Sequence, residues 1–109
     1  MKKIDKPWGH EIIWAETGDY VGKILHINAG HRLSKQFHRV KEETVYVLKG
    51  TLYNYDEHDN IQKFTPGQSF HVNVGQVHRF GANESSVEIV EVSTPHLDDV
   101  VRIEDDYSR

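Results

Sequence analysis

The sequence predicts an all-β domain, and three observations support this fold class. Turn-forming groups of Gly, Pro, Asn, Asp and Ser recur along the chain at intervals of about 8 to 12 residues. The segments between them are short and rich in Val, Ile, Tyr and Phe, which favour strands. No long stretch keeps the 3.6-residue apolar period of an amphipathic helix. This combination is typical of a β-sandwich or a β-barrel.

The turn-forming groups delimit the predicted strands in order. The first ones are Thr17-Gly18-Asp19, Asn28-Ala29-Gly30 and Lys49-Gly50, and the later ones include Pro66-Gly67 and Val74-Gly75. The strands expected between them cover residues 10–15, 20–28, 43–48, 51–56, 61–64, 68–72, 78–80 and 87–93. The tail, residues 98–109, fits either a short helix or an edge strand.

Strand alternation places a charged residue on the apolar face of three of these strands. Lys23 shares its face with Val21, Leu25 and Ile27, Glu43 shares one with Val45 and Val47, and Glu91 shares one with Val87 and Ile89. A charge on such a face is costly to bury unless it is paired or bound to a metal. The pattern predicts a polar site inside a barrel. The alternative is a one-residue error in the predicted register, which would move every side chain to the opposite face of its strand.

Length and composition restrict the possible classes of protein. The 109 residues predict one domain, residues 1–109, with 37% apolar residues and a net charge of −4. A mildly acidic chain is not expected to bind nucleic acid or an anionic membrane. The absence of Cys excludes disulfides and Cys-ligated zinc. No apolar run reaches the roughly 20 residues of a membrane span, and the charged N-terminus resembles no signal peptide, so a cytoplasmic location is expected.

Histidine is abundant, with 8 residues, and two of them fall into a pattern that predicts a metal site. Gln36 and His38 are two residues apart and point the same way on an extended segment, Glu43 opens the next strand, and His78 begins a later one. These four side chains offer an amide oxygen, two imidazoles and a carboxylate, a set that suits Zn²⁺ first and also Mn²⁺, Fe²⁺, Co²⁺ or Ni²⁺. The alternative is a metal-free pocket in which the four are hydrogen bonded.

The segments that carry these residues resemble the two motifs of the cupin superfamily. In the first motif the glycines are Gly30 and Gly50, and Gln36 replaces the first histidine of His-x-His. In the second motif Gly67, Gly75 and His78 fit, whereas Asn73 replaces the usual Pro and Asn83 comes one residue late. The resemblance implies a cupin fold, a double-stranded β-helix or jelly-roll barrel, and a homodimer.

Other segments resemble one cupin branch, the type II phosphomannose isomerases and the C-terminal cupin domain of bifunctional mannose-1-phosphate guanylyltransferases. They are Lys6-Pro7-Trp8-Gly9, the segment 33–38 (in which Gln is that branch's expected ligand), His78-Arg79 and the tail 98–109. Two departures lie near the pocket: Thr44-Val45 follows the ligand Glu43 where the branch has His-Trp, and the path from Glu91 to Asp98 is shorter.

The resemblance implies a metal-dependent isomerase that interconverts mannose 6-phosphate and fructose 6-phosphate through a cis-enediol. Glu91 is the predicted proton-transferring base and Lys23 the other predicted catalytic residue; alternatively the two form a buried ion pair. Arg102 is predicted to bind the substrate phosphate, with Arg79 and Lys23 as weaker candidates. Alternatively, Arg102 forms a salt bridge with Glu104 or Asp105.

Two other classes of function fit the sequence. One is a metal-holding cupin that binds a sugar or a small carboxylate without turnover. The other is a metal-dependent cupin enzyme of another class, such as a dioxygenase or a lyase, because a fold does not fix a function. Gln36 argues against a dioxygenase, whose iron site prefers histidines and a carboxylate.

Overall fold

The computed structural model describes residues 1–107, and every regular element among them is a strand. The eleven strands are β1 (Lys2–Lys6), β2 (Gly9–Glu16), β3 (Val21–Ile27), β4 (Lys35–Phe37), β5 (Glu43–Lys49), β6 (Leu52–Tyr55), β7 (Ile61–Phe64), β8 (Ser69–Val72), β9 (Phe80–Gly81), β10 (Val87–Ser93) and β11 (Val101–Glu104). Within this part of the chain there is no helix that could cross a membrane. The all-β prediction is confirmed.

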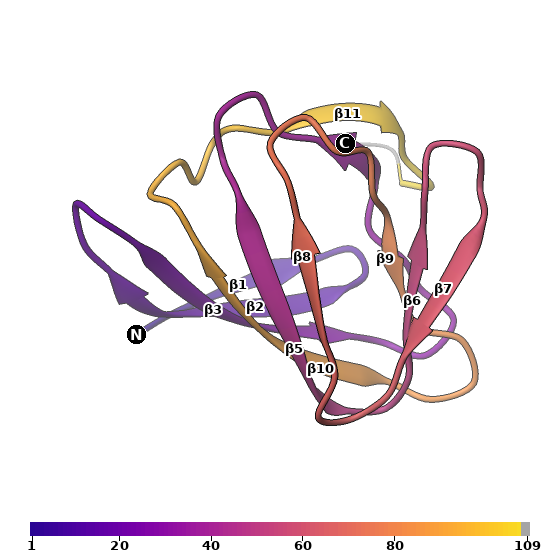
Figure 1. Ribbon diagram of the computed structural model, residues 1–109. Coiled ribbons are helices and arrows are strands. Elements are labelled where there is room, and N and C mark those ends of the chain that lie inside the picture. Colours follow the sequence, from indigo (N-terminus) through magenta and orange to yellow (C-terminus); the bar gives the residue numbers. More distant parts are fainter. Residues whose placement is uncertain (108–109) are drawn as a thin grey trace.

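The strands form one large and two small sheets that surround a common interior (Figure 1). The large sheet has the order β1-β2-β3-β10-β5-β8, and the smaller sheets have the orders β7-β6-β9 and β11-β4. Isolated bridges between Arg32 and Gly81 and between Gln36 and His78 connect the segment of β4 to that of β9. The sheets therefore close into a barrel with an inner and an outer face.

The observed strands differ from the predicted ones at both ends of the chain. Strand β1 has the sequence Lys-Lys-Ile-Asp-Lys, which lacks apolar alternation, and it owes its conformation to antiparallel pairing with β2. In the middle of the chain, the three-residue strand β4 was not among the predicted strands, and β9 covers residues 80–81 where a strand was predicted at 78–80. The tail forms the edge strand β11 rather than a helix, and it pairs with β4. The last two residues of the tail segment compared with the isomerase branch, Ser108 and Arg109, lie outside the described residues.

The inward faces predicted for β3, β5 and β10 are confirmed. Glu91 on β10 lies opposite Lys23 on β3 and Val45 on β5 in the antiparallel register, and all three are buried. A register slip is therefore excluded for these strands. The apolar core fills the rest of the interior and consists of Trp8, Leu25, Ile27, Val45, Val47, Leu52, Val72, Phe80, Ala82, Val87 and Ile89.

The turn between β1 and β2 is the Lys6-Pro7-Trp8-Gly9 segment. Trp8 is buried in the core, and its carbonyl accepts a hydrogen bond of 2.9 Å from the amide of Asn28. Gly9 has a φ of 153°, and a Cβ there would lie 1.9 Å from the carbonyl oxygen of His26. Only glycine can lie this close to the His26 carbonyl, so the turn fixes the position of Lys6 at the end of β1.

Candidate metal centre

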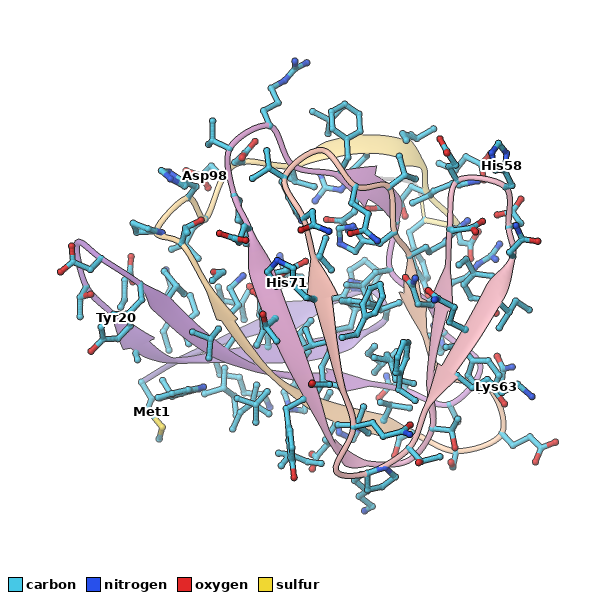
Figure 2. The ribbon with its side chains drawn as sticks, viewed as in Figure 1. Met1, Tyr20, His58, Lys63, His71 and Asp98 are labelled. Carbon is cyan, nitrogen blue, oxygen red and sulfur yellow. The ribbon has the colours of Figure 1, made fainter. Side chains whose placement is uncertain are left out.

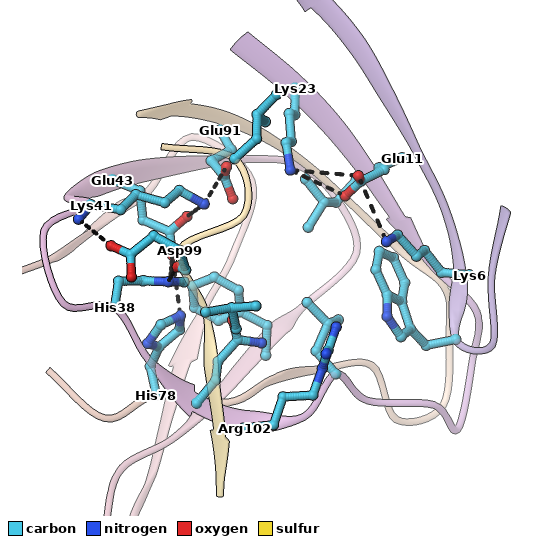
Figure 3. A pocket seen from close by; sticks show the side chains of 17 residues that line it. Lys6, Glu11, Lys23, His38, Lys41, Glu43, His78, Glu91, Asp99 and Arg102 are labelled. Atoms are coloured by element: carbon cyan, nitrogen blue, oxygen red, sulfur yellow. Dashed lines mark hydrogen bonds and ion pairs between the residues drawn. The ribbon is translucent and has the colours of Figure 1, made fainter. Parts of the chain in front are cut away.

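Three of the four predicted ligands meet inside the barrel (Figure 3). His38 follows β4, Glu43 begins β5, and His78 precedes β9. The Nε2 atoms of His78 and His38 lie 3.1 Å and 3.4 Å from Oε1 of Glu43. The three residues are buried, and their ligand atoms all lie within 4.8 Å of one another. The geometry thus gathers two imidazoles and a carboxylate around one point.

The hydrogen bonds of the two imidazoles fit a metal. Nδ1 of His38 donates to the carbonyl oxygen of Asp99 at 2.6 Å, and Nδ1 of His78 lies 3.1 Å from the carbonyl oxygen of Gln76. In a neutral imidazole this assigns the proton to Nδ1 and leaves Nε2 as a lone-pair donor. Nε2 of His38 is buried and has no hydrogen-bond partner within the described chain. A divalent cation would satisfy this atom and would remove the cost of burying it.

Gln36 lies beside this cluster and lines the same cavity. Its amide and carbonyl exchange backbone hydrogen bonds of 3.0 Å and 2.9 Å with His78, so the two side chains share a face. Its Nε2 donates to Oγ of Ser34 at 3.0 Å and to the Ser34 carbonyl at 3.3 Å. The amide oxygen, the atom a metal would use, takes no part in those bonds. The assignment of Gln36 as a fourth ligand stays a prediction.

A second carboxylate and a lysine complete this end of the cavity. Nζ of Lys41 lies 3.4 Å from Oε2 of Glu43 and 3.4 Å from Oε2 of Glu91, so one ammonium group bridges two buried carboxylates. Burial and the neighbouring charge of Glu43 raise the pKa of Glu91 to about 8, although Lys41 opposes the shift. Glu91 is thus placed to exchange a proton near neutral pH while Glu43 stays ionised.

The pKa values of Glu43 and Lys41 move in the directions that favour their charged forms. Burial by itself would raise the pKa of Glu43. Hydrogen bonds that His38, His78 and Glu91 can donate to it, together with the charge of Lys41, outweigh burial and hold that pKa well below its usual value. A bound metal ion would take the place of the imidazole protons at Nε2. Burial would lower the pKa of Lys41, but the charges of Glu91 and Glu43 outweigh it and raise that pKa. A carboxylate and an ammonium group are therefore fixed beside the two imidazoles.

Lys23 does not pair with Glu91, so the alternative of an ion pair between them is wrong. Its Nζ lies 3.4 Å from Oε2 of Glu11 on β2, and Lys6 lies 4.0 Å from the other oxygen of Glu11. Lys23 still acts on Glu91 through its charge, which lowers the pKa of that carboxyl and so partly opposes the effect of burial. A direct catalytic role for Lys23 stays a prediction.

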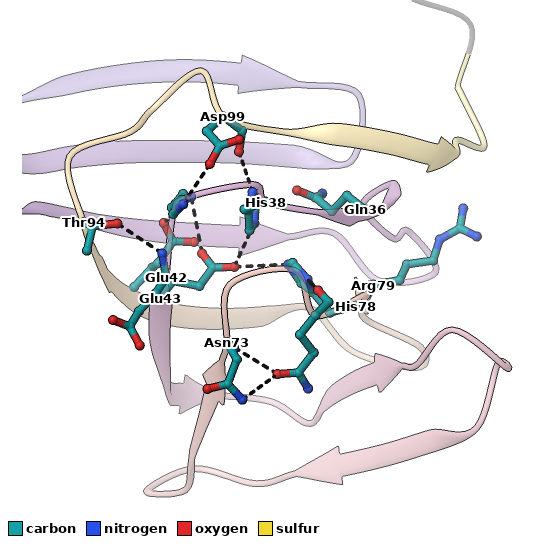
Figure 4. A network of polar contacts seen from close by, with 12 residues as sticks. Gln36, His38, Glu42, Glu43, Asn73, His78, Arg79, Thr94 and Asp99 are labelled. Carbon is teal, nitrogen blue, oxygen red and sulfur yellow. Dashed lines mark hydrogen bonds and ion pairs between the residues drawn. The ribbon is translucent and has the colours of Figure 1, made fainter.

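The structure places the two predicted phosphate-binding arginines differently. Arg102 lines the cavity, and no ion pair to Glu104 or Asp105 is found for it. Arg79 lies outside the cavity lining, and its buried guanidinium contacts Asp106 at 2.8 Å, Glu104 at 3.5 Å and the carbonyl of Leu33 at 2.8 Å. Figure 4 shows it directed away from Glu43. The prediction for Arg79 is corrected: this residue holds the C-terminal segment in place.

Asp99 organises the loop between His38 and Glu43 (Figure 4). Its carboxylate accepts hydrogen bonds of 2.8 to 3.0 Å from the backbone amides of Arg39, Val40 and Lys41. These bonds lower the pKa of Asp99 to about 2. One residue thus holds both the ring of His38, through its carbonyl, and the loop that carries Lys41.

Sequence reasoning missed Glu11, Lys41 and Asp99. Strand alternation could have found two of them, since Glu11 shares the inward face of β2 with Ile13, and Lys41 lies two residues before Glu43. Asp99 lies in the tail segment that resembles the isomerase branch, but nothing local indicates its role, because its partners are about 60 residues away in sequence. Other histidines lie outside the cluster: His58 is at the tip of the β6–β7 hairpin and His71 is on the outer side of β8 (Figure 2).

Comparison with known proteins assigns the family. A family model described as the C-terminal domain of mannose-6-phosphate isomerase matches residues 1–105. The chain belongs to this family. Over 98% of its length it is 31% identical to the alginate biosynthesis protein AlgA of Pseudomonas aeruginosa, and over 99% it is 29% identical to the xanthan biosynthesis protein XanB of Xanthomonas campestris. It spans about a quarter of the length of these relatives, 23% and 24%.

Solved structures of low sequence identity share the fold and confirm the cupin barrel. KdgF from a Halomonas species superposes with a TM-score of 0.78 at 20% identity, over 87% of this chain and 88% of that one. A cupin-like protein from Thermotoga maritima gives 0.79 at 13% identity, over 91% and 78% of the two chains. A cupin-superfamily sugar phosphate isomerase from Silicibacter pomeroyi gives 0.70 at 16% identity, over 78% and 58%.

Proposed function

We propose that this domain is a metal-dependent aldose–ketose isomerase of a sugar phosphate, with mannose 6-phosphate and fructose 6-phosphate as the substrate pair. The observation that carries the proposal is the buried arrangement of Glu43 with its two histidines and, bridged to it by Lys41, a second carboxylate, Glu91. Membership in the mannose-6-phosphate isomerase family supports the choice of substrate. A purely structural site would not need a second buried carboxylate beside the first.

The reaction moves a proton between two neighbouring carbons of the sugar. The proton on C2 of the aldose is too weakly acidic for a carboxylate to remove unaided, because negative charge develops on the sugar oxygens. A divalent ion, Zn²⁺ first, held by His38, Glu43, His78 and Gln36, would supply Lewis-acid stabilisation of that charge. The chain itself supplies the base and the group that orients the substrate.

Glu91 is the proton carrier in this proposal. Its carboxylate takes the proton from C2 and returns it to C1, while the proton of the C2 hydroxyl passes to the oxygen on C1, so the atoms of substrate and product balance. Lys41 holds Glu91 next to Glu43, and the charge of Lys23 opposes the rise in the pKa of Glu91. Arg102, on the wall of the same cavity, binds the phosphate and fixes which carbon faces Glu91.

The test is conversion of mannose 6-phosphate by protein loaded with Zn²⁺, Mn²⁺, Co²⁺ or Fe²⁺, followed as fructose 6-phosphate. We expect Glu91→Gln to lower kcat by about a hundredfold or more, with metal content unchanged. Glu88→Gln is the matched control, since Glu88 lies on the same strand but contacts His26 on the other face. Absence of conversion with all four metals would reject the isomerase, and sugar phosphate binding without turnover would favour a binding domain.

A further inference from the structure

A second charged cluster lies across the cavity from His38 and His78 (Figure 3). It consists of Lys6 at the end of β1, Glu11 on β2 and Lys23 on β3, and all three line the cavity. The Lys23 ammonium lies 3.4 Å and the Lys6 ammonium 4.0 Å from the Glu11 carboxylate. The side chains of Lys23 and Glu11 are each only 10% exposed. This cluster has no part in holding a metal.

Its charges do not balance, and the surplus is positive. Two ammonium groups share the single carboxylate of Glu11. Arg102 lines the same cavity, and no ion pair to a residue of the described chain is found for it. Lys23 and Glu11 are buried, and a second cation beside that one carboxylate is a surplus charge that an anion would neutralise. Lys6 and Arg102 are partly or fully exposed, so they can serve as cations for such an anion without a burial cost of their own. The surplus therefore indicates a site for an anionic group.

We propose that Lys6, Lys23 and Arg102 form the subsite for the phosphoryl group of the substrate, with Glu11 holding the two lysines in place. This inference rests on the proposed function, because it assigns the far end of the same cavity. It also gives a role to the Lys6-Pro7-Trp8-Gly9 turn, which neither the metal nor the proton transfer explains: buried Trp8 and the close approach of Gly9 to the His26 carbonyl fix the point from which Lys6 enters the cavity.

The arrangement of the large sheet supports a substrate that reaches from one cluster to the other. Strands β5 and β10 carry Glu43 and Glu91, and the next strands in the sheet, β3 and β2, carry Lys23 and Glu11. A phosphoryl group at the lysines would leave the other end of the sugar facing the carboxylates and histidines. Two negative charges on a phosphate suit a site with three cations and one carboxylate.

The test is titration of the full chain, freed of metal with a chelator, with inorganic phosphate at constant ionic strength, followed by phosphorus NMR or calorimetry. We expect Lys6→Gln to weaken phosphate binding about tenfold, the size of one charge-assisted hydrogen bond. Lys6→Arg should keep most of the affinity. The matched control is Lys3→Gln, since Lys3 lies on the same strand but is exposed on the opposite side. Arg102→Gln tests the subsite again at an exposed position where folding is not at risk.

Affinity that is unchanged in both Lys6→Gln and Arg102→Gln would overturn the inference, and so would an equal loss in Lys3→Gln. Because the titration contains neither metal nor sugar, its result does not depend on turnover. Phosphate binding that requires Lys6 in a protein without isomerase activity would reject the proposed function and keep the subsite. Isomerase activity with no effect of Lys6 or Arg102 on phosphate binding or on KM would reject the subsite and keep the function.

Discussion

The two ends of the barrel interior are built by the same strands and differ in what those strands bury. At one end β3, β5 and β10 present Leu25, Ile27, Val47, Val87 and Ile89, all at most 3% exposed. At the other end the same inward faces continue as Lys23, Glu43 and Glu91. The ladder between β3 and β10 is continuous through both ends, and Ile89 and Glu91 are two residues apart on β10.

The apolar end contributes the stability of the fold, and the polar end contributes the chemistry of the site. Burying the apolar end releases water from hydrocarbon and stabilises the fold. Burying carboxylates and ammonium groups costs desolvation free energy that their ion pairs only partly return. The buried charges of the polar end are therefore explained by ligand binding, and the buried side chains of the apolar end by the stability of the fold.

The largest expected effect on stability comes from the apolar end. Ile89→Ala should lower the free energy of unfolding by about 2 to 5 kcal/mol, because the fully buried side chain leaves a cavity. Denaturant unfolding measures it, and Val90→Ala, on the outer side of the same strand, should cost roughly 1 kcal/mol or less. Equal losses in both variants would contradict the division between the two faces.

A smaller effect on stability but a large one on ligand binding is expected at the polar end. His78→Ala should weaken metal affinity by at least about tenfold, since a ligand is lost and second-shell changes alone cost that much. The rise in Tm that metal gives the wild type should shrink accordingly. His71→Ala is the control, because His71 is exposed and contacts Thr44 and Glu42. Unchanged metal content in His78→Ala would refute the ligand assignment.

The smallest effect is expected in the loop between His38 and Glu43, which Asp99 holds. Asp99 has a pKa lowered to about 2 by three backbone amides, so its ionised form contributes stability that is complete above its ordinary pKa of 3.8. This contribution is lost as the pH falls from about 4 towards 2. Asp99→Asn should therefore lower Tm at neutral pH, and the difference from the wild type should vanish near pH 2.

Thermal melts across this pH range measure the effect, with Asp98→Asn as the control at an exposed neighbouring position. A weaker metal affinity in Asp99→Asn would show that the loop also orients His38. A difference in Tm that stayed constant down to pH 2 would assign the effect to packing instead of to the carboxylate charge.

Much of the fold could be predicted from sequence because strand alternation is a local property. The inward positions of Lys23, Glu43 and Glu91 followed from the apolar residues two positions away, and the spacing of Gln36, His38, Glu43 and His78 matched a known motif. Strand β1 could not be found in this way, because its charged sequence becomes a strand only through pairing with β2. The homodimer and the cytoplasmic location stay predictions.

The sequence by itself determined the all-β class, the inward faces and the residues able to hold a metal, because periodicity and side-chain chemistry are properties of short segments of the chain. Only the tertiary structure decided which charged side chains form ion pairs. Lys23 pairs with Glu11, Lys41 pairs with both Glu43 and Glu91, and Arg79 pairs with the C-terminal segment. Ion pairs depend on distances across strands far apart in the chain. Closure of the barrel sets those distances, and no local pattern encodes them.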